Sequence, residues 1–191
     1  MGVTALEPGA AGTTPRPTYL LDNNIVSYFL NCDRKADLQR IATGLELAVV
    51  AEVHEEALRY AKRGAEYKKW QATSGVSVRR ILLGTSASIC LAHLRKNTGG
   101  LKDLGELASI ALASEDERCV VVMNDKNGLW IALQELFGPT ERVIRLSTFL
   151  RRAHAAVGLD ARAARELAGR ANLLDAPPSW WDAWLKSLPA G

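Results

Sequence analysis

The clearest pattern in the sequence is an apolar run that stops at one acid and two amides and then resumes at helical spacing. Residues 19–21 are apolar, Asp22, Asn23 and Asn24 follow them, and apolar residues return from Ile25 onward. This pattern predicts a buried strand that leads directly into a helix. Asp22 would then lie at the carboxyl end of the strand, where open α/β sheets bind their ligands. Such a carboxylate either caps the helix or is the first ligand of a metal ion.

Short apolar runs continue to alternate with helical segments along the chain. Further strands are expected at residues 47–50, 119–123 and 142–146, and helices at residues 53–62, 104–113 and 129–137. Residues 59–100 have a helical pattern that glycines interrupt. Strands that alternate with helices predict an α/β fold with a parallel central sheet and crossover helices on both of its faces.

The two ends of the chain differ in composition from this domain, which we place at residues 18–152. Residues 1–17 are rich in Gly, Pro, Ala and Thr, which favours a disordered leader. Residues 153–191 are expected to form a helical C-terminal extension, in which Trp180, Trp181 and Trp184 crowd one short helix. These tryptophans either dock back on the domain or anchor a partner chain, because Trp is enriched at interface hot spots.

The overall composition is that of one globular domain, with 191 residues of which 48% are hydrophobic and 24% charged. The N-terminal segment lacks the pattern of a signal peptide, and charges interrupt every apolar stretch well short of a membrane span. Three scattered cysteines argue against a disulfide framework. We therefore expect a cytoplasmic protein with no membrane segment.

Positive charge is concentrated in the middle of the chain. Residues 59–100 contain nine Lys or Arg and a single acid, a local charge of +8, although the whole chain carries only +3. One basic face favours a polyanionic partner such as RNA, and a solvated helical surface is the alternative. The candidate RNA-binding residues are Lys68, Lys69, Arg79 and Arg80.

Acids recur in the setting of Asp22 at three more places in the chain. Asp125 ends the apolar run of residues 120–125, Glu106 begins an alanine-rich helix, and Glu55 and Glu56 follow the second strand. The carboxyl ends of parallel strands converge, so these acids are expected to lie close together. Oxygen ligands without Cys or His favour Mg²⁺ or Mn²⁺ over zinc. Each acid also has an ordinary alternative as a helix cap, a turn residue or a solvated side chain.

Only one of the two adjacent glutamates can face this cluster, because neighbouring helical residues point about 100° apart. We choose Glu56, since Val53, Ala57 and Tyr60 would form the buried stripe beside it.

Together these motifs resemble those of PIN-domain ribonucleases. Residues 21–25 look like the opening Asp-Thr-Asn motif of the family, residues 105–113 its acidic, alanine-rich third motif and residues 121–125 its fourth, while residues 53–57 match the second more loosely. The resemblance spans residues 19–152. The chain departs from the pattern at Asn23, which replaces the usual hydroxyl residue, and in the length of the segment 59–100.

The resemblance implies a Rossmann-like three-layer domain and a Mg²⁺- or Mn²⁺-dependent endoribonuclease. In this interpretation Asp22, Glu106 and Asp125 bind the metal ion and Glu56 completes the catalytic set. Asn24, together with Asn23, would orient Asp22. Many bacterial members are toxins that a small antitoxin holds in check, so RNA and an antitoxin are the expected partners. A non-catalytic PIN-like module that binds RNA or protein is the alternative, and a homodimer is left open.

Overall fold

The computed structural model describes residues 16–59, 63–99, 103–136, 141–170 and 179–188, and everything below concerns these ranges. Several predicted parts of the chain lie outside these ranges, namely residues 1–15 of the expected leader, Tyr60, and the segments 100–102 and 137–140.

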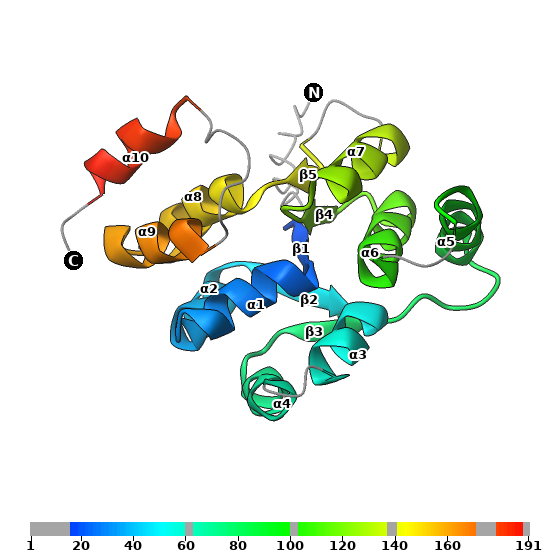
Figure 1. Cartoon of the computed structure of the whole chain (residues 1–191), viewed down its shortest axis with the longest axis horizontal. Helices are drawn as coiled ribbons and strands as arrows, with labels where there is room; N and C mark the ends of the chain where they lie inside the picture. Colours follow the sequence, from blue (N-terminus) through cyan, green and yellow to red (C-terminus); the bar gives the residue numbers. More distant parts are fainter. Residues whose placement is uncertain (1–15, 60–62, 100–102, 137–140, 171–178, 189–191) are drawn as a thin grey trace, which may run out of the picture.

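The fold is built on a sheet of five parallel strands, as the alternating pattern predicted (Figure 1). The strands are β1 (Thr18–Leu21), β2 (Glu46–Val50), β3 (Ser77–Arg79), β4 (Cys119–Val122) and β5 (Val143–Ile144). Their spatial order is β3-β2-β1-β4-β5, so β1 pairs with β2 on one side and with β4 on the other. The chain therefore adds β2 and β3 on one side of β1, and then β4 and β5 on its other side.

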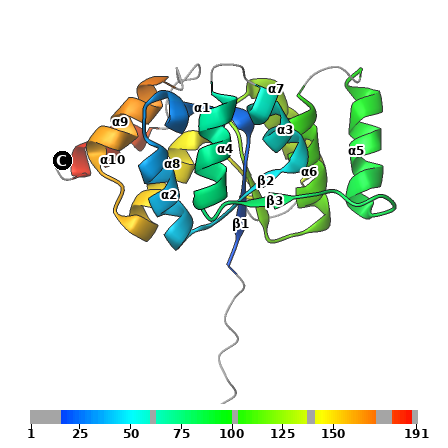
Figure 2. The same cartoon turned by 90° about the horizontal axis from the view of Figure 1, so that it is seen from below.

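Helices cover both faces of the sheet. They are α1 (Asn23–Asn31), α2 (Lys35–Gly44), α3 (Ala51–Arg59), α4 (Gly64–Thr73), α5 (Ser86–Asn97), α6 (Leu104–Glu115), α7 (Lys126–Glu135), α8 (Leu146–Val157), α9 (Ala161–Arg170) and α10 (Trp181–Ser187). In two perpendicular views α5 and α6 lie on one side of β1, and α2, α8 and α9 lie on the other (Figures 1 and 2).

Alternate strand residues enter two different apolar cores, because successive side chains of a strand point to opposite faces. Leu20 and Val121 pack with residues of α6 and α7, whereas Leu21 and Val122 pack with residues of α1 and α8. Both faces of the central strands are thus buried, which is typical of a parallel sheet.

The expectation of a helical segment over residues 59–100 was wrong in one respect. Between α4 and α5 the chain forms the edge strand β3, which pairs with β2 through Val78 and Val49. Arg79 therefore belongs to a strand and not to a helix.

The C-terminal helices pack on the same core as the rest of the domain. Trp181 of α10 is only 3% exposed and shares the core with Tyr19 and Leu167. The tryptophan-rich helix therefore docks back on the domain. The expected boundary between residues 152 and 153 falls within α8. None of the described helices is long and apolar enough to cross a membrane.

Candidate functional site

Asp22 lies at the carboxyl end of β1, at the point where strand order reverses. Its backbone N–H donates to the Val122 carbonyl over 3.0 Å, which extends the pairing of β1 with β4 by one residue. Its side chain is 3% exposed and accepts a hydrogen bond from the Asn24 backbone N–H over 3.3 Å as the N-cap of α1. Asp22 is therefore a helix cap, and it also lies at the edge where α/β sheets bind ligands.

Asp125 occupies the equivalent position beyond the neighbouring strand. It is the N-cap of α7, and its Oδ1 accepts hydrogen bonds from the backbone N–H groups of Asn127 (2.8 Å) and Gly128 (3.0 Å). Two adjacent parallel strands thus each continue into a helix that an aspartate caps at the same edge of the sheet.

The Glu106 carboxylate lies against the first turn of α7. Glu106 is in the first turn of α6 and is 6% exposed. A Cβ atom at Gly128 would stand 2.7 Å from Glu106 Oε2, so the absence of a side chain at Gly128 makes room for this carboxylate. Because Gly128 N–H also donates to Asp125, the two acids share one helix terminus.

Glu56 faces the same region and Glu55 does not. Glu56 Oε1 accepts a hydrogen bond from the Gly105 backbone N–H over 3.2 Å, next to Glu106 in the chain. Glu55 is exposed and forms an ion pair with Arg59 over 3.2 Å. The register of α3 therefore directs Glu56, and not Glu55, toward α6.

A fifth acid, Asp103, was missed by the sequence reasoning. It precedes α6 with a positive φ of 56° and forms no side-chain capping bond. Its negative charge raises the pKa of Asp22, Glu56 and Glu106, so it lies within the electrostatic reach of all three. The spacing Asp103-x-x-Glu106 before an apolar helix matches a capping-box signal, and this signal could have pointed to the residue.

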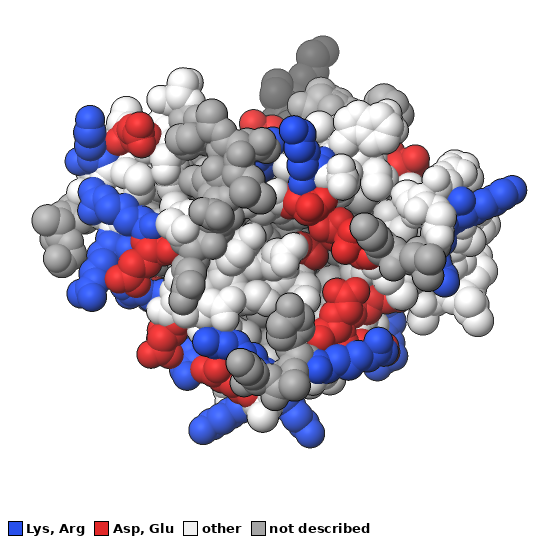
Figure 3. Space-filling view, in the orientation of Figure 1, with Lys and Arg blue, Asp and Glu red and all other residues white. Residues whose placement is uncertain are grey.

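Asp22, Glu56 and Glu106 are held in environments that favour their protonated forms. Burial raises the pKa of Asp22 to about 6, although the backbone N–H groups of Asn23 and Asn24 partly oppose the shift. Burial also raises the pKa of Glu106 to about 9, and the neighbouring acids add to the effect. The pKa of Glu56 is raised as well, chiefly by burial. Figure 3 shows acidic side chains gathered near the centre of this face, with Lys and Arg toward its outer parts.

The donor chemistry of this edge fits a hard divalent cation, since it offers carboxylate oxygens from four separate segments. Within the described ranges, however, no three His, Cys, Asp or Glu side chains stand close enough together to hold a metal ion. Asp22, Asp125 and Glu56 each have a carboxylate oxygen that accepts hydrogen bonds from backbone N–H groups. In the described structure Asp22 and Asp125 thus act as helix caps, and Glu56 is bonded to the first turn of α6.

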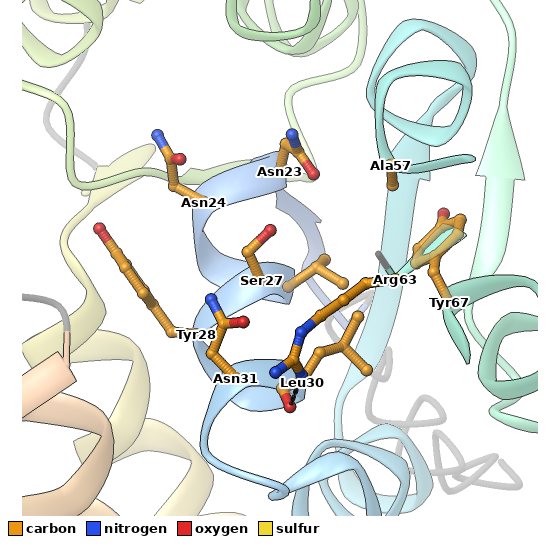
Figure 4. Close-up of a pocket in the computed structure, with 10 residues that line it drawn as sticks. Asn23, Asn24, Ser27, Tyr28, Leu30, Asn31, Ala57, Arg63 and Tyr67 are labelled. Carbon is orange, nitrogen blue, oxygen red and sulfur yellow. Dashed lines mark hydrogen bonds between the residues drawn. The ribbon is translucent and has the colours of Figure 1, made fainter. Parts of the chain in front are cut away.

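The two asparagines after Asp22 act on it through the backbone. The hydrogen bonds to the Asp22 carboxylate come from the N–H groups of Asn23 and Asn24. Both residues also line a cavity between α1, α3 and α4, and Figure 4 shows them at one end of α1.

The four candidate RNA-binding residues are not brought together. Lys68 and Lys69 are exposed on α4, and Arg80 is exposed after β3. Arg79 instead pairs over 3.0 Å with Glu46, whose Oε1 also accepts from Thr18 Oγ1 over 2.6 Å. Glu46 and Thr18 are the first residues of β2 and β1, so the Arg79 guanidinium lies at the edge of the sheet opposite the acids.

Comparisons with known proteins do not add a relative. No protein-family model matches the chain, and neither a curated protein nor a solved structure is similar to it.

Proposed function

We propose that this protein is a Mg²⁺- or Mn²⁺-dependent endoribonuclease with a Rossmann-like, three-layer PIN-like domain. The observation that carries the proposal is the convergence of acids from separate segments at the carboxyl edge of β1 and β4. Asp22 and Glu106 are buried there at a cost in folding free energy, because burial and mutual repulsion disfavour the charged carboxylates. Such perturbed acids in one place are typical of functional sites.

The residues have distinct roles in the proposed reaction. Asp22, Glu106 and Asp125 would hold the divalent cation, which when bound activates water and neutralises charge on the phosphodiester. Glu56, fixed by the Gly105 N–H, would hold the attacking water. The backbone N–H groups of Asn23 and Asn24 orient Asp22.

Exposed cations outside the acidic edge would contact the phosphates of a single-stranded RNA. Lys68, Lys69 and Arg80 are exposed and can take this role, whereas Arg79 is paired at the opposite edge. The proposal extends to a toxin whose activity a small antitoxin protein controls, and co-expression with the product of the neighbouring gene would test that extension.

The direct test is cleavage of a panel of transfer and messenger RNAs with Mg²⁺, Mn²⁺ or a chelator. Asp22→Asn should reduce the cleavage rate at least about 100-fold, because it removes the charge of a metal ligand. Mutating residues that only hydrogen-bond to metal ligands already reduces activity by up to about 100-fold. Asparagine caps helices as well as aspartate does, so the fold should be kept.

Asp160→Asn is the matched control. Asp160 also accepts a backbone N–H, from Ala163 over 2.6 Å, but at the start of α9. Its variant should cleave RNA at the wild-type rate. Cleavage that survives the chelator, or an Asp22→Asn variant of full activity, would contradict the proposal.

A non-catalytic PIN-like module that binds RNA or protein is the second candidate. The observation that favours it is that, within the described ranges, no three His, Cys, Asp or Glu side chains stand close enough together to hold a metal ion. RNA binding without metal-dependent cleavage would support this alternative.

A further inference from the structure

A cavity of about 180 Å³ lies between α1, α3 and α4, directly beside the acidic edge. Its apolar wall comes from Val26, Leu30 and Ala57. The rest of the cavity wall is formed by polar residues, namely Asn23, Asn24, Ser27, Tyr28, Asn31 and Arg63 (Figure 4). The proposed reaction assigns no role to this space.

The sequence of α1 explains why this cavity is polar without being acidic. The helix buries Ile25, Val26, Phe29 and Leu30, and the residues between them face outward. The exposed face of an amphipathic helix usually carries charged residues. Here α1 has none, and its outward residues are amides and hydroxyl groups. Such groups both donate and accept hydrogen bonds in fixed directions.

The far side of the cavity is held in place by contacts between α1, α3 and α4. Arg63 donates a hydrogen bond from Nη1 to the Leu30 carbonyl and lies 3.6 Å from Glu66, so its guanidinium is fixed beside Asn31 (Figure 4). The Tyr67 hydroxyl is hydrogen-bonded to His54 Nδ1 over 3.0 Å. A planar guanidinium is suited to stacking on a flat ring.

Tyr28 links the cavity to the acids. It lines the cavity, and burial together with the negative charges of Asp22 and Asp125 raises the pKa of its hydroxyl group, so it lies near both acids. Asn23 and Asn24, which also line the cavity, directly follow Asp22 in the sequence. A base bound in the cavity would therefore be close to a phosphate of the same RNA strand bound at the acidic edge.

We propose that the cavity binds a pyrimidine base of single-stranded RNA, next to the phosphodiester at the acidic edge. The proposal rests on the nuclease function proposed above. The size fits one ring, since a cavity of about 150 Å³ holds benzene. Bases of single strands are splayed out and recognised by stacking and by hydrogen bonds to their edges, which the amides, Ser27 and Arg63 supply.

Binding of two oligoribonucleotides tests the proposal without depending on catalysis. The full-length Asp125→Asn variant with Mg²⁺ is titrated with labelled hexauridylate and hexaadenylate. It should bind hexauridylate roughly tenfold more tightly, the effect of one or two hydrogen bonds. Adding Ser27→Ala or Asn31→Ala should reduce this ratio several-fold, because each removes a group that faces the base.

Gln134→Ala is the control, since it removes an exposed helical amide of α7 outside the cavity. It should leave the ratio unchanged. Equal binding of both hexamers, binding of neither, or a ratio that neither cavity variant alters would overturn the proposal. Cleavage by the wild-type chain is measured separately with Mn²⁺. Pyrimidine preference without cleavage would contradict the nuclease function alone, and cleavage without preference would contradict the cavity alone.

Discussion

Adjacent residues on α3 have opposite surroundings, and this difference can be tested with isosteric changes. Glu56→Gln should lower the cleavage rate strongly, because a neutral amide holds water less effectively than a carboxylate. Its Oε1 can still accept from Gly105 N–H, so the melting temperature should change little. Glu55→Gln should have wild-type activity, since Glu55 only pairs with Arg59 on the surface. The reverse outcome would mean that the register of α3 differs from the one described.

The raised acid pKa values make the stability of the metal-free protein depend on pH. In the unfolded chain Asp22 and Glu106 lose their protons near 3.8 and 4.5, whereas in the folded protein their pKa values are about 6 and about 9. The folded state therefore binds more protons between these limits, and the free energy of unfolding falls as pH rises through them. At about 1.4 kcal/mol per pKa unit, the total loss should be at most on the order of 10 kcal/mol.

Urea denaturation in chelator, from about pH 5 to about pH 9, measures this dependence. The profile of Glu106→Gln should be nearly flat above about pH 7, because the variant lacks the group that titrates there and Asp22 has by then lost its proton. Mg²⁺ or Mn²⁺ should restore stability to the wild-type chain at the alkaline end. Parallel profiles for the wild type and Glu106→Gln would contradict the assignment.

At the level of single residues, the sequence predicted the positions of most of the acids but not their hydrogen bonds. Asp22, Glu106 and Asp125 could be located because each follows or faces a recognisable strand end. Asp103 was missed, since a left-handed residue before a helix leaves no periodic signal and only its capping-box spacing to Glu106 pointed to it. The hydrogen bond from the Gly105 N–H to Glu56 also depends on a tertiary contact that no local pattern encodes.

Among the elements, α7 has a close contact with Glu106 that favours glycine at position 128. Gly128→Ala would place a Cβ atom 2.7 Å from Glu106 Oε2 and 3.1 Å from Met123 Sδ. Because Glu106 is buried, we expect a loss of about 1–3 kcal/mol in the free energy of unfolding, together with weaker activity.

Gly169→Ala provides the comparison, since nothing lies within 4 Å of a Cβ atom there. Alanine at this helical site should stabilise the protein by up to about 1 kcal/mol. Chemical denaturation of both variants gives the two differences, and similar gains at both sites would refute the contact at Gly128.

The success of the sequence in predicting elements depended on their apolar content. The central strands β1, β2 and β4 are continuous apolar runs, so their positions were predicted within one or two residues. The edge strand β3 has only Val78 between Ser77 and Arg79, too little alternation for a strand signal. Helix α2 was also missed, because only Leu38 and Ile41 face the core.

For the whole molecule, the distribution of charge suggests a measurable dependence of RNA binding on salt. Replacing Lys68 and Lys69 with glutamine should flatten the plot of log affinity against log salt by about 0.7 for each phosphate contact that is lost. Saturating RNA should restore most of the turnover, because the acids are untouched.

Arg79→Gln is the control for this experiment, since its guanidinium is paired with Glu46 at the opposite edge. It should keep the wild-type salt slope. If Arg79→Gln changes the salt slope and the lysine variant does not, the RNA binds at the edge of the sheet opposite the acids.

The pairing of β1 with β4 has a consequence for the order of events during synthesis. Leu21 lies opposite Val122, so about 100 residues must leave the ribosome between the two halves of the acidic edge. At a synthesis rate of about 5–20 residues per second, the nascent chain spends several seconds with β1 exposed along one side. A partial chain that ends before β4 lacks Asp125 and the partner strand of β1. Activity would therefore arise only late in translation, when the closing of this long loop joins the central strands.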